Sequence, residues 1–139
     1  MTWKPILCVD FDGVVHSYIS GWQGAAVIPD PPVKGALLWL WKATEWWDVQ
    51  IYSSRSSQER GIEAMQAWML QHSRYELGPD HPMSQIHGER DAGYQYPITF
   101  AKDKPAAFLT IDDRCLTFDG DWEELDPAEL RNFKPWFKR

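Results

Sequence analysis

Three short, largely apolar segments, each ending abruptly in polar residues, constrain the fold of this 139-residue chain most strongly. The segments are Ile6–Val9, Val49–Tyr52 and Ala106–Ile111. A strand that is apolar on both faces is typical of a parallel sheet covered by helices, because the helices exclude water from both sides. We therefore expect each segment to be a strand of one buried sheet.

Helical patterns separate the first two strand segments and follow the second. Apolar residues recur at helical spacing between residues 33 and 47 and again between 62 and 72. The second stripe follows Ser56–Glu59, a pattern typical of a capping box. The order strand, helix, strand, helix, strand predicts an α/β fold, with a three-layer α/β/α, Rossmann-like parallel sheet.

The remaining signals are weaker. Residues 14–32 and 73–95 are rich in turn residues, and we expect the first stretch to form a long loop or flap. Two further short strands are predicted at 97–100 and 115–118. A last helix is predicted at 127–133, with Asp126 as its N-cap.

The composition is that of an ordinary soluble globular protein. Hydrophobic residues make up 44% of the chain and charged residues 24%, which is enough apolar material for one core. We expect residues 1–139 to form a single domain. The net charge of −6 repels nucleic-acid backbones, so non-specific nucleic-acid binding is disfavoured, although an enzyme that holds one phosphate is not excluded.

The cysteines and the hydropathy pattern bear on location. Cys8 and Cys115 lie in apolar contexts and are predicted to be buried free thiols of a reducing compartment. The sequence contains no apolar run suited to a signal peptide or a membrane span. We therefore expect a cytoplasmic protein with no membrane partner.

Polar clusters follow the three predicted strands, at Asp10–Gly13, Ser53–Arg55 and Asp112–Asp113. Because parallel strands end at the same edge of a sheet, these clusters should converge. Carboxylates 4 Å apart repel by roughly 4 kcal/mol per pair at an effective dielectric constant near 20, and a bound cation removes that repulsion. An all-oxygen ligand set favours Mg²⁺. The candidate metal ligands are Asp10, Asp12, Asp112 and Asp113.

Magnesium at this edge suits phosphoryl chemistry. A carboxylate beside the metal can attack phosphorus, and a second carboxylate two residues further on can exchange protons with the leaving oxygen and with water. Ser53 offers a hydroxyl group and Lys104 a positive charge to the transferring group. Gly13 permits a sharp turn and a close approach of the backbone to a ligand.

These motifs, in this order, resemble those of the haloacid dehalogenase superfamily of phosphohydrolases. The Asp-x-Asp-Gly-Val motif is matched at Asp10–Val14, and the strand ending in Ser or Thr at Ile51–Ser53. The motif lysine is matched by Lys104, with Lys102 as a competitor, and the acidic pair by Asp112–Asp113. The Ser-x-Arg run at Ser53–Arg55 is similar to that of the polynucleotide 3′-phosphatase branch. The resemblance covers about residues 6–118.

The resemblance implies roles for the two aspartates of the first motif and for the acidic pair. Asp10 would be the nucleophile that forms an aspartyl-phosphate. Asp12 would be the acid/base, and its main-chain carbonyl would also meet Mg²⁺. Asp112 would be the main metal ligand, with Asp113 bound directly or through water.

The same resemblance implies how substrate is held. Ser53 and Lys104 would bind the phosphoryl oxygens, and Arg55 the rest of the substrate. No cap domain fits into 139 residues, so only the stretches 14–32 and 73–95 could shield the site. The expected partner is a phosphorylated small molecule, a nucleotide or an oligonucleotide end, because capless members tend to accept bulky phosphoesters. The oligomeric state is not predicted.

Two other functions remain open at this stage. A metal-dependent nucleotide-sugar transferase also uses Asp-x-Asp, but only to hold metal and diphosphate. A catalytically inactive relative could serve as a binding module. Within the flap, Tyr18 and Trp22 could stack on a nucleobase, or they could fold the loop onto the body of the protein.

Overall fold

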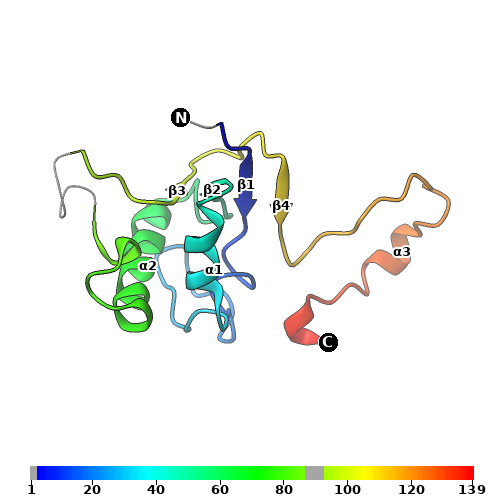
Figure 1. Ribbon diagram of the computed structural model, residues 1–139. Coiled ribbons are helices and arrows are strands. Elements are labelled where there is room, and N and C mark those ends of the chain that lie inside the picture. Colours follow the sequence, from blue (N-terminus) through cyan, green and yellow to red (C-terminus); the bar gives the residue numbers. More distant parts are fainter. Residues whose placement is uncertain (1–2, 87–92) are drawn as a thin grey trace.

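The structure is a computed structural model that describes residues 3–86 and 93–139 (Figure 1). In chain order, its elements are β1 (Ile6–Val9), α1 (Ala36–Ala43), β2 (Asp48–Ile51), α2 (Gly61–Leu77), the 3₁₀ helix η1 (Pro82–Ser84), β3 (Thr99–Phe100), β4 (Leu109–Ile111), α3 (Pro127–Leu130) and the 3₁₀ helix η2 (Trp136–Lys138).

The four strands form one parallel sheet in the order β3-β2-β1-β4. Leu7 of β1 is level with Val49 of β2 on one side and with Leu109 of β4 on the other. The predicted α/β fold with a parallel sheet is therefore confirmed, and all three of the strongly apolar segments contribute a strand to it.

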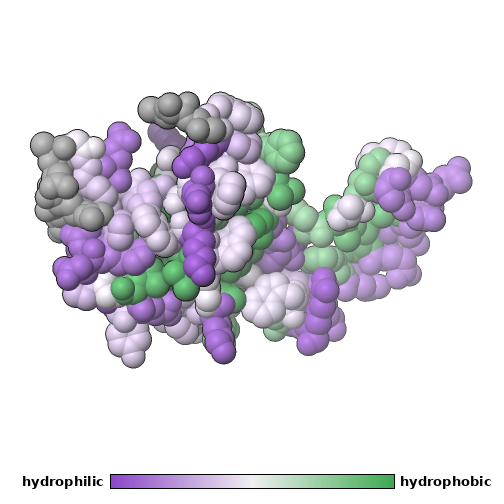
Figure 2. All heavy atoms as spheres, viewed as in Figure 1, coloured by the Kyte–Doolittle hydropathy of each residue, from purple (hydrophilic) through white to green (hydrophobic). Residues whose placement is uncertain are grey.

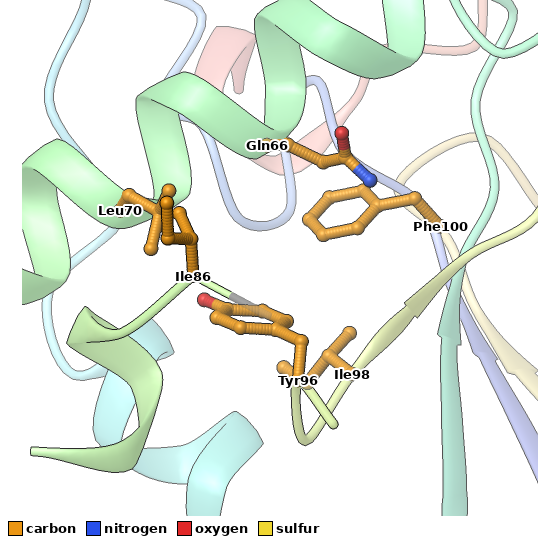
Figure 3. A pocket seen from close by; sticks show the side chains of 6 residues that line it. All are labelled: Gln66, Leu70, Ile86, Tyr96, Ile98 and Phe100. Atoms are coloured by element: carbon orange, nitrogen blue, oxygen red, sulfur yellow. The ribbon is translucent and has the colours of Figure 1, made fainter. Parts of the chain in front are cut away.

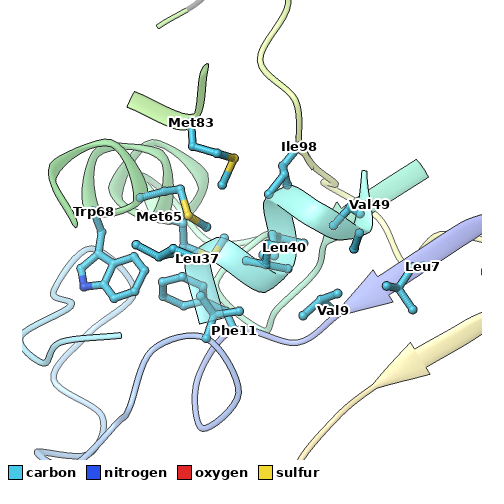
Figure 4. Close-up of a cluster of buried hydrophobic side chains, with 14 residues drawn as sticks. Leu7, Val9, Phe11, Leu37, Leu40, Val49, Met65, Trp68, Met83 and Ile98 are labelled. Carbon is cyan, nitrogen blue, oxygen red and sulfur yellow. The ribbon is translucent and has the colours of Figure 1, made fainter. Parts of the chain in front are cut away.

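The core lies between one face of this sheet and the two long helices (Figure 4). Leu7 and Val9 of β1 point into it, whereas the intervening Cys8 points to the opposite face, because side chains alternate along a strand. The helices supply Leu37 and Leu40 from α1, and Met65 and Met69 from α2. Both long helices thus pack on the same face of the sheet, and the three-layer arrangement stays a prediction.

The helices differ from their predicted ranges because loop geometry overrides the apolar pattern. The helix α1 begins only after Gly35, which has a φ of +83°, and residues 44–47 form turns rather than a further helical turn. The capping-box prediction is wrong. The Ser56 hydroxyl accepts a hydrogen bond from the Ser53 N–H group, and α2 begins at Gly61 after Arg60, whose φ is +64°.

The C-terminal part is less regular than predicted. The strand expected at 115–118 is absent, and those residues are exposed. Asp126 does accept a hydrogen bond from the Ala128 N–H group, as an N-cap should, but α3 ends at Leu130. Apolar atoms gather over β4 and the segment after it, where Leu109, Leu116 and Phe118 are exposed (Figure 2).

Three further expectations concern cysteines, membranes and the second loop. Cys8 and Cys115 are both free, but only Cys8 is buried, so the burial predicted for Cys115 is wrong. No helix among the described residues is long and apolar enough to cross a membrane. In the stretch 73–95, α2 continues to Leu77 and η1 follows, while residues 87–92 lie outside the described part of the chain.

Candidate functional site

Three carboxylates meet where β1 and β4 end. Asp10 directly follows β1, and Asp112 and Asp113 directly follow β4. The strands are neighbours, and the Asp10 N–H group donates to the Ile111 carbonyl at 2.9 Å. One oxygen of each carboxylate lies within 4.8 Å of the others. The structure therefore brings together three of the four candidate metal ligands, although about 100 residues separate the two motifs.

The surroundings of Asp10 disfavour its charged form. Burial, a hydrogen bond with Asp113 and the charge of Asp112 together raise the pKa of Asp10 to about 8. The Asp113 side chain is only 3% exposed, and the nearest cation found for it among the described residues, Arg114 Nε, is 3.9 Å away. A divalent cation would relieve this crowding, and the oxygen-only ligand set matches the chemistry of Mg²⁺.

The Asp12 side chain is not part of this cluster and is held by two donors. One carboxylate oxygen accepts a hydrogen bond from His16 Nδ1 at 2.8 Å, and the other accepts one from Arg55 Nε at 2.9 Å. Burial alone would raise the pKa of Asp12, but these two hydrogen bonds hold it below its ordinary value. Asp12 is therefore a carboxylate beside the cluster rather than a side-chain member of it.

His16, from the loop 14–32, is a further residue of the site. It is fully buried, and its Nε2 accepts the Asp30 N–H group at 3.1 Å, which leaves Nδ1–H as the donor to Asp12. The turn that brings it back includes a hydrogen bond from the Gly13 N–H group to the His16 carbonyl. The sequence feature that could have identified His16 is its position four residues after Asp12, with Gly13 between them to allow a turn.

Arg55 is fully buried and joins the end of β2 to the loop 14–32. Its Nε donates to Asp12, and its Nη1 donates to the carbonyls of Gly24, Ala25 and Val27 at 2.8 to 3.1 Å. The Trp22 ring covers the guanidinium group at 4.7 Å. Among the described residues, Nη2 has no hydrogen-bond partner. Arg55 thus anchors the loop, and the two N–H donors of its buried Nη2 are unused within the described part of the chain.

A pocket of about 270 Å³ joins the carboxylates to the loop. Its lining consists of Asp10, Asp12, Tyr18, Trp22, Ser53, Ser54, Asp113 and Arg114. Ser53 is buried, and its hydroxyl oxygen accepts the Arg55 N–H group at 3.1 Å. The pocket therefore unites the candidate nucleophile, the candidate acid/base and the candidate phosphate-binding serine.

Neither candidate lysine lines this pocket. Lys104 is exposed in the segment between β3 and β4, although its charge is close enough to act on the Cys8 thiol. Lys102 is exposed too, and it lines a separate surface pocket with residues at the start of α2.

The C-terminal segment reaches the site, which the sequence reasoning missed. Trp136 Nε1 donates to the Gly13 carbonyl at 2.7 Å, and the Tyr18 and Phe137 rings meet edge to face at 6.3 Å. Gly13 has a φ of +82°, and a Cβ at this position would overlap Asp113 Oδ2. Gly13 therefore permits the acidic pair to approach the first motif closely.

Two of the other pockets are lined mainly by apolar side chains. One, of about 320 Å³, lies between α2 and the segment that leads into β3, with Leu70 and Tyr96 on opposite walls (Figure 3). The other, of about 440 Å³, lies beside α1 and includes Val33 and Trp39. Neither offers groups for phosphoryl chemistry, so the acidic pocket is the candidate site.

Comparison of the chain with protein-family models, curated proteins and solved structures finds no match. The resemblance to the haloacid dehalogenase superfamily therefore rests on the sequence motifs alone.

Proposed function

We propose that this chain is a Mg²⁺-dependent phosphomonoester hydrolase of the haloacid dehalogenase type. The observation that carries the proposal is the meeting of Asp10, Asp112 and Asp113 at the carboxyl ends of parallel strands, within 4.8 Å of one another. The adjoining pocket also contains Asp12 and Ser53. A three-layer fold without a cap domain and a cytoplasmic location belong to the same proposal.

Asp10 is proposed as the nucleophile. Its carboxylate oxygen would form a bond to phosphorus as the bond from phosphorus to the leaving oxygen breaks, giving an aspartyl-phosphate. A bound Mg²⁺ would neutralise phosphate charge during this attack, with Asp112 and Asp113 among its ligands. Ser53 lies in the same pocket, where it can bind a phosphoryl oxygen.

Asp12 is proposed to move the protons. The donors His16 and Arg55 favour its ionised form, which can take a proton from the water that hydrolyses the aspartyl-phosphate. In the preceding step, Asp12 must instead carry a proton for the leaving oxygen. Each carboxylate oxygen accepts one hydrogen bond and has a second lone pair, which can hold this proton while His16 and Arg55 keep their contacts.

Arg55 and Lys104 need different changes to bind substrate. The Nη2 of Arg55 has no hydrogen-bond partner among the described residues, but it is buried and Arg55 does not line the pocket, so the covering loop 14–32 would have to move before Nη2 could donate to a substrate oxygen. Lys104 is exposed, so its side chain would have to turn toward the pocket to reach a phosphoryl oxygen.

The orientation of Asp12 also favours a hydrolase over a nucleotide-sugar transferase. A transferase of that kind uses Asp-x-Asp to hold metal and diphosphate. Here Asp10 joins the carboxylates at the end of β4, whereas the Asp12 side chain pairs with His16 and Arg55. The two aspartates thus have different environments, as a nucleophile and an acid/base require.

The test is phosphate release from an aryl phosphate and from a panel of nucleotides and sugar phosphates. We expect turnover with Mg²⁺, none with EDTA, and a loss of roughly 10³-fold or more in Asp10→Asn. Asp80→Asn, which changes an exposed carboxylate after α2, is the matched control and should keep full activity. Undiminished turnover in Asp10→Asn would refute the nucleophile. Mg²⁺ binding with no turnover on any ester would favour the binding-module alternative.

A further inference from the structure

Aromatic side chains from the loop 14–32 form part of the pocket that holds the carboxylates. Tyr18 and Trp22 line it together with Asp10 and Asp113. The Trp22 side chain remains 46% exposed although it lies in this pocket. Part of its ring is therefore accessible to a ligand in the pocket.

Both rings are fixed in position by the surrounding fold. The Trp22 ring lies over the Arg55 guanidinium at 4.7 Å, and that guanidinium is itself bound to Asp12 and to three loop carbonyls. The Tyr18 ring meets His16 edge to face at 5.9 Å, in addition to Phe137 on another side. Rings that are ordered before binding lose little conformational entropy when a ligand arrives.

The charge around the pocket restricts what can bind there. Arg114 is the one basic side chain among the lining residues, and it is 55% exposed. The whole chain carries a net charge of −6, which repels a long phosphate backbone. A ligand with one phosphate at the carboxylate cluster and an uncharged flat ring beside Trp22 suits this arrangement.

We propose that the leaving group of the substrate carries a nucleobase that stacks on Trp22, so that the substrate is a free nucleoside monophosphate. This inference rests on the proposed hydrolase function and adds the substrate class. The phosphate lies at Asp10 and Ser53, and the base lies against the exposed part of the Trp22 ring. Stacking of a base on an aromatic side chain tolerates all four bases, so the site selects for a base without selecting which one.

The experiment compares adenosine 5′-monophosphate with ribose 5-phosphate, which has the same sugar and phosphate but no base. In the wild-type protein, we expect kcat/KM for the nucleotide to exceed that for ribose 5-phosphate by roughly 5- to 150-fold, the range that one stacked base provides. Trp22→Leu should lose most of this preference while it still hydrolyses ribose 5-phosphate. Trp22→Phe should keep part of the preference, because it retains a smaller ring.

The control is Trp46→Leu, which changes a tryptophan that is 68% exposed beyond α1 and should leave the preference intact. Equal kcat/KM for the two substrates in the wild-type protein would overturn the stacking site and leave the hydrolase standing. Equal loss of both activities in Trp22→Leu would assign Trp22 a structural role and overturn it too. Faster hydrolysis of a phosphorylated oligonucleotide would overturn the free nucleotide. No turnover of any ester would refute the hydrolase, and this inference with it.

Discussion

At the scale of single residues, Gly13 has the most direct control over the carboxylate cluster. Its φ of +82° disfavours any side chain, and a Cβ would overlap Asp113 Oδ2 and come within 2.8 Å of Phe137 Cε1. The overlap with Asp113 matters most, because that carboxylate is one of the three that meet at the end of the sheet. A methyl group here should therefore disturb the proposed metal site and not only the fold.

We predict that Gly13→Ala lowers both stability and Mg²⁺ affinity. The left-handed backbone conformation alone costs about 1–2 kcal/mol of unfolding free energy, and the displacement of Asp113 should also weaken the proposed metal site. Urea unfolding measures the first effect and calorimetric titration with Mg²⁺ the second. Gly21→Ala is the matched control, since Gly21 has a φ of +73° but its added methyl group would meet no other part of the described chain within 4 Å. It should lose stability only, and an equal loss of Mg²⁺ affinity would contradict the argument.

At the scale of structural elements, Arg55 joins the end of β2 to the loop 14–32. Its partners lie 28 to 43 residues earlier in the chain, so this one side chain fixes a long segment that has little regular structure of its own. Asp12 depends on it as well, because Arg55 supplies one of its two donors. Loss of Arg55 would leave a largely buried carboxylate and three carbonyls without this partner.

We predict that Arg55→Met destabilises the protein by about 3–5 kcal/mol, the range for breaking a buried ion pair by removing one partner. Arg55→Lys should not restore the stability, because a single ammonium group cannot match the planar fork of donors. Urea unfolding measures the cost, and limited proteolysis should cut the loop 14–32 faster in both variants. Arg114→Met, which changes a half-exposed arginine, should stay within about 0.5 kcal/mol of the wild type. Wild-type stability in Arg55→Met would refute this role.

The sequence predicts the strands better than it predicts the contacts between distant segments. The predicted strand Ile6–Val9 has the same bounds as β1, because a continuous apolar run is a local pattern. The approach of Asp10 to Asp112 was also predictable, since parallel strands end at one edge. The pairing of Asp12 with Arg55 could not be predicted, because a contact between residues 43 positions apart leaves no periodic pattern in the sequence. The start of α2 was misplaced for a related reason, as Ser56 satisfies a backbone N–H group in the turn instead of capping a helix.

At the scale of the whole molecule, the fold keeps its core and its candidate site apart. The core occupies the helix-covered face of the sheet, whereas the carboxylates lie beyond the ends of β1 and β4. Charge repulsion at the strand ends is therefore a cost that the apolar core must offset as long as no cation is bound. That cost depends on the protonation of Asp10, which makes the stability of the whole chain depend on pH.

We predict that metal-free protein loses stability as the pH rises from about 4 to about 8. Folding raises the pKa of Asp10 from 3.8 to about 8, so the folded state retains a proton that the unfolded chain releases, and the stabilisation present below pH 4 disappears across this window. Saturating Mg²⁺ favours the carboxylate and should flatten the dependence, with proton release on binding below pH 8. Urea unfolding at several pH values, with EDTA or with Mg²⁺, measures both effects. Asp10→Asn lacks the titrating group, so an unchanged slope in this variant with EDTA would show that another residue is responsible.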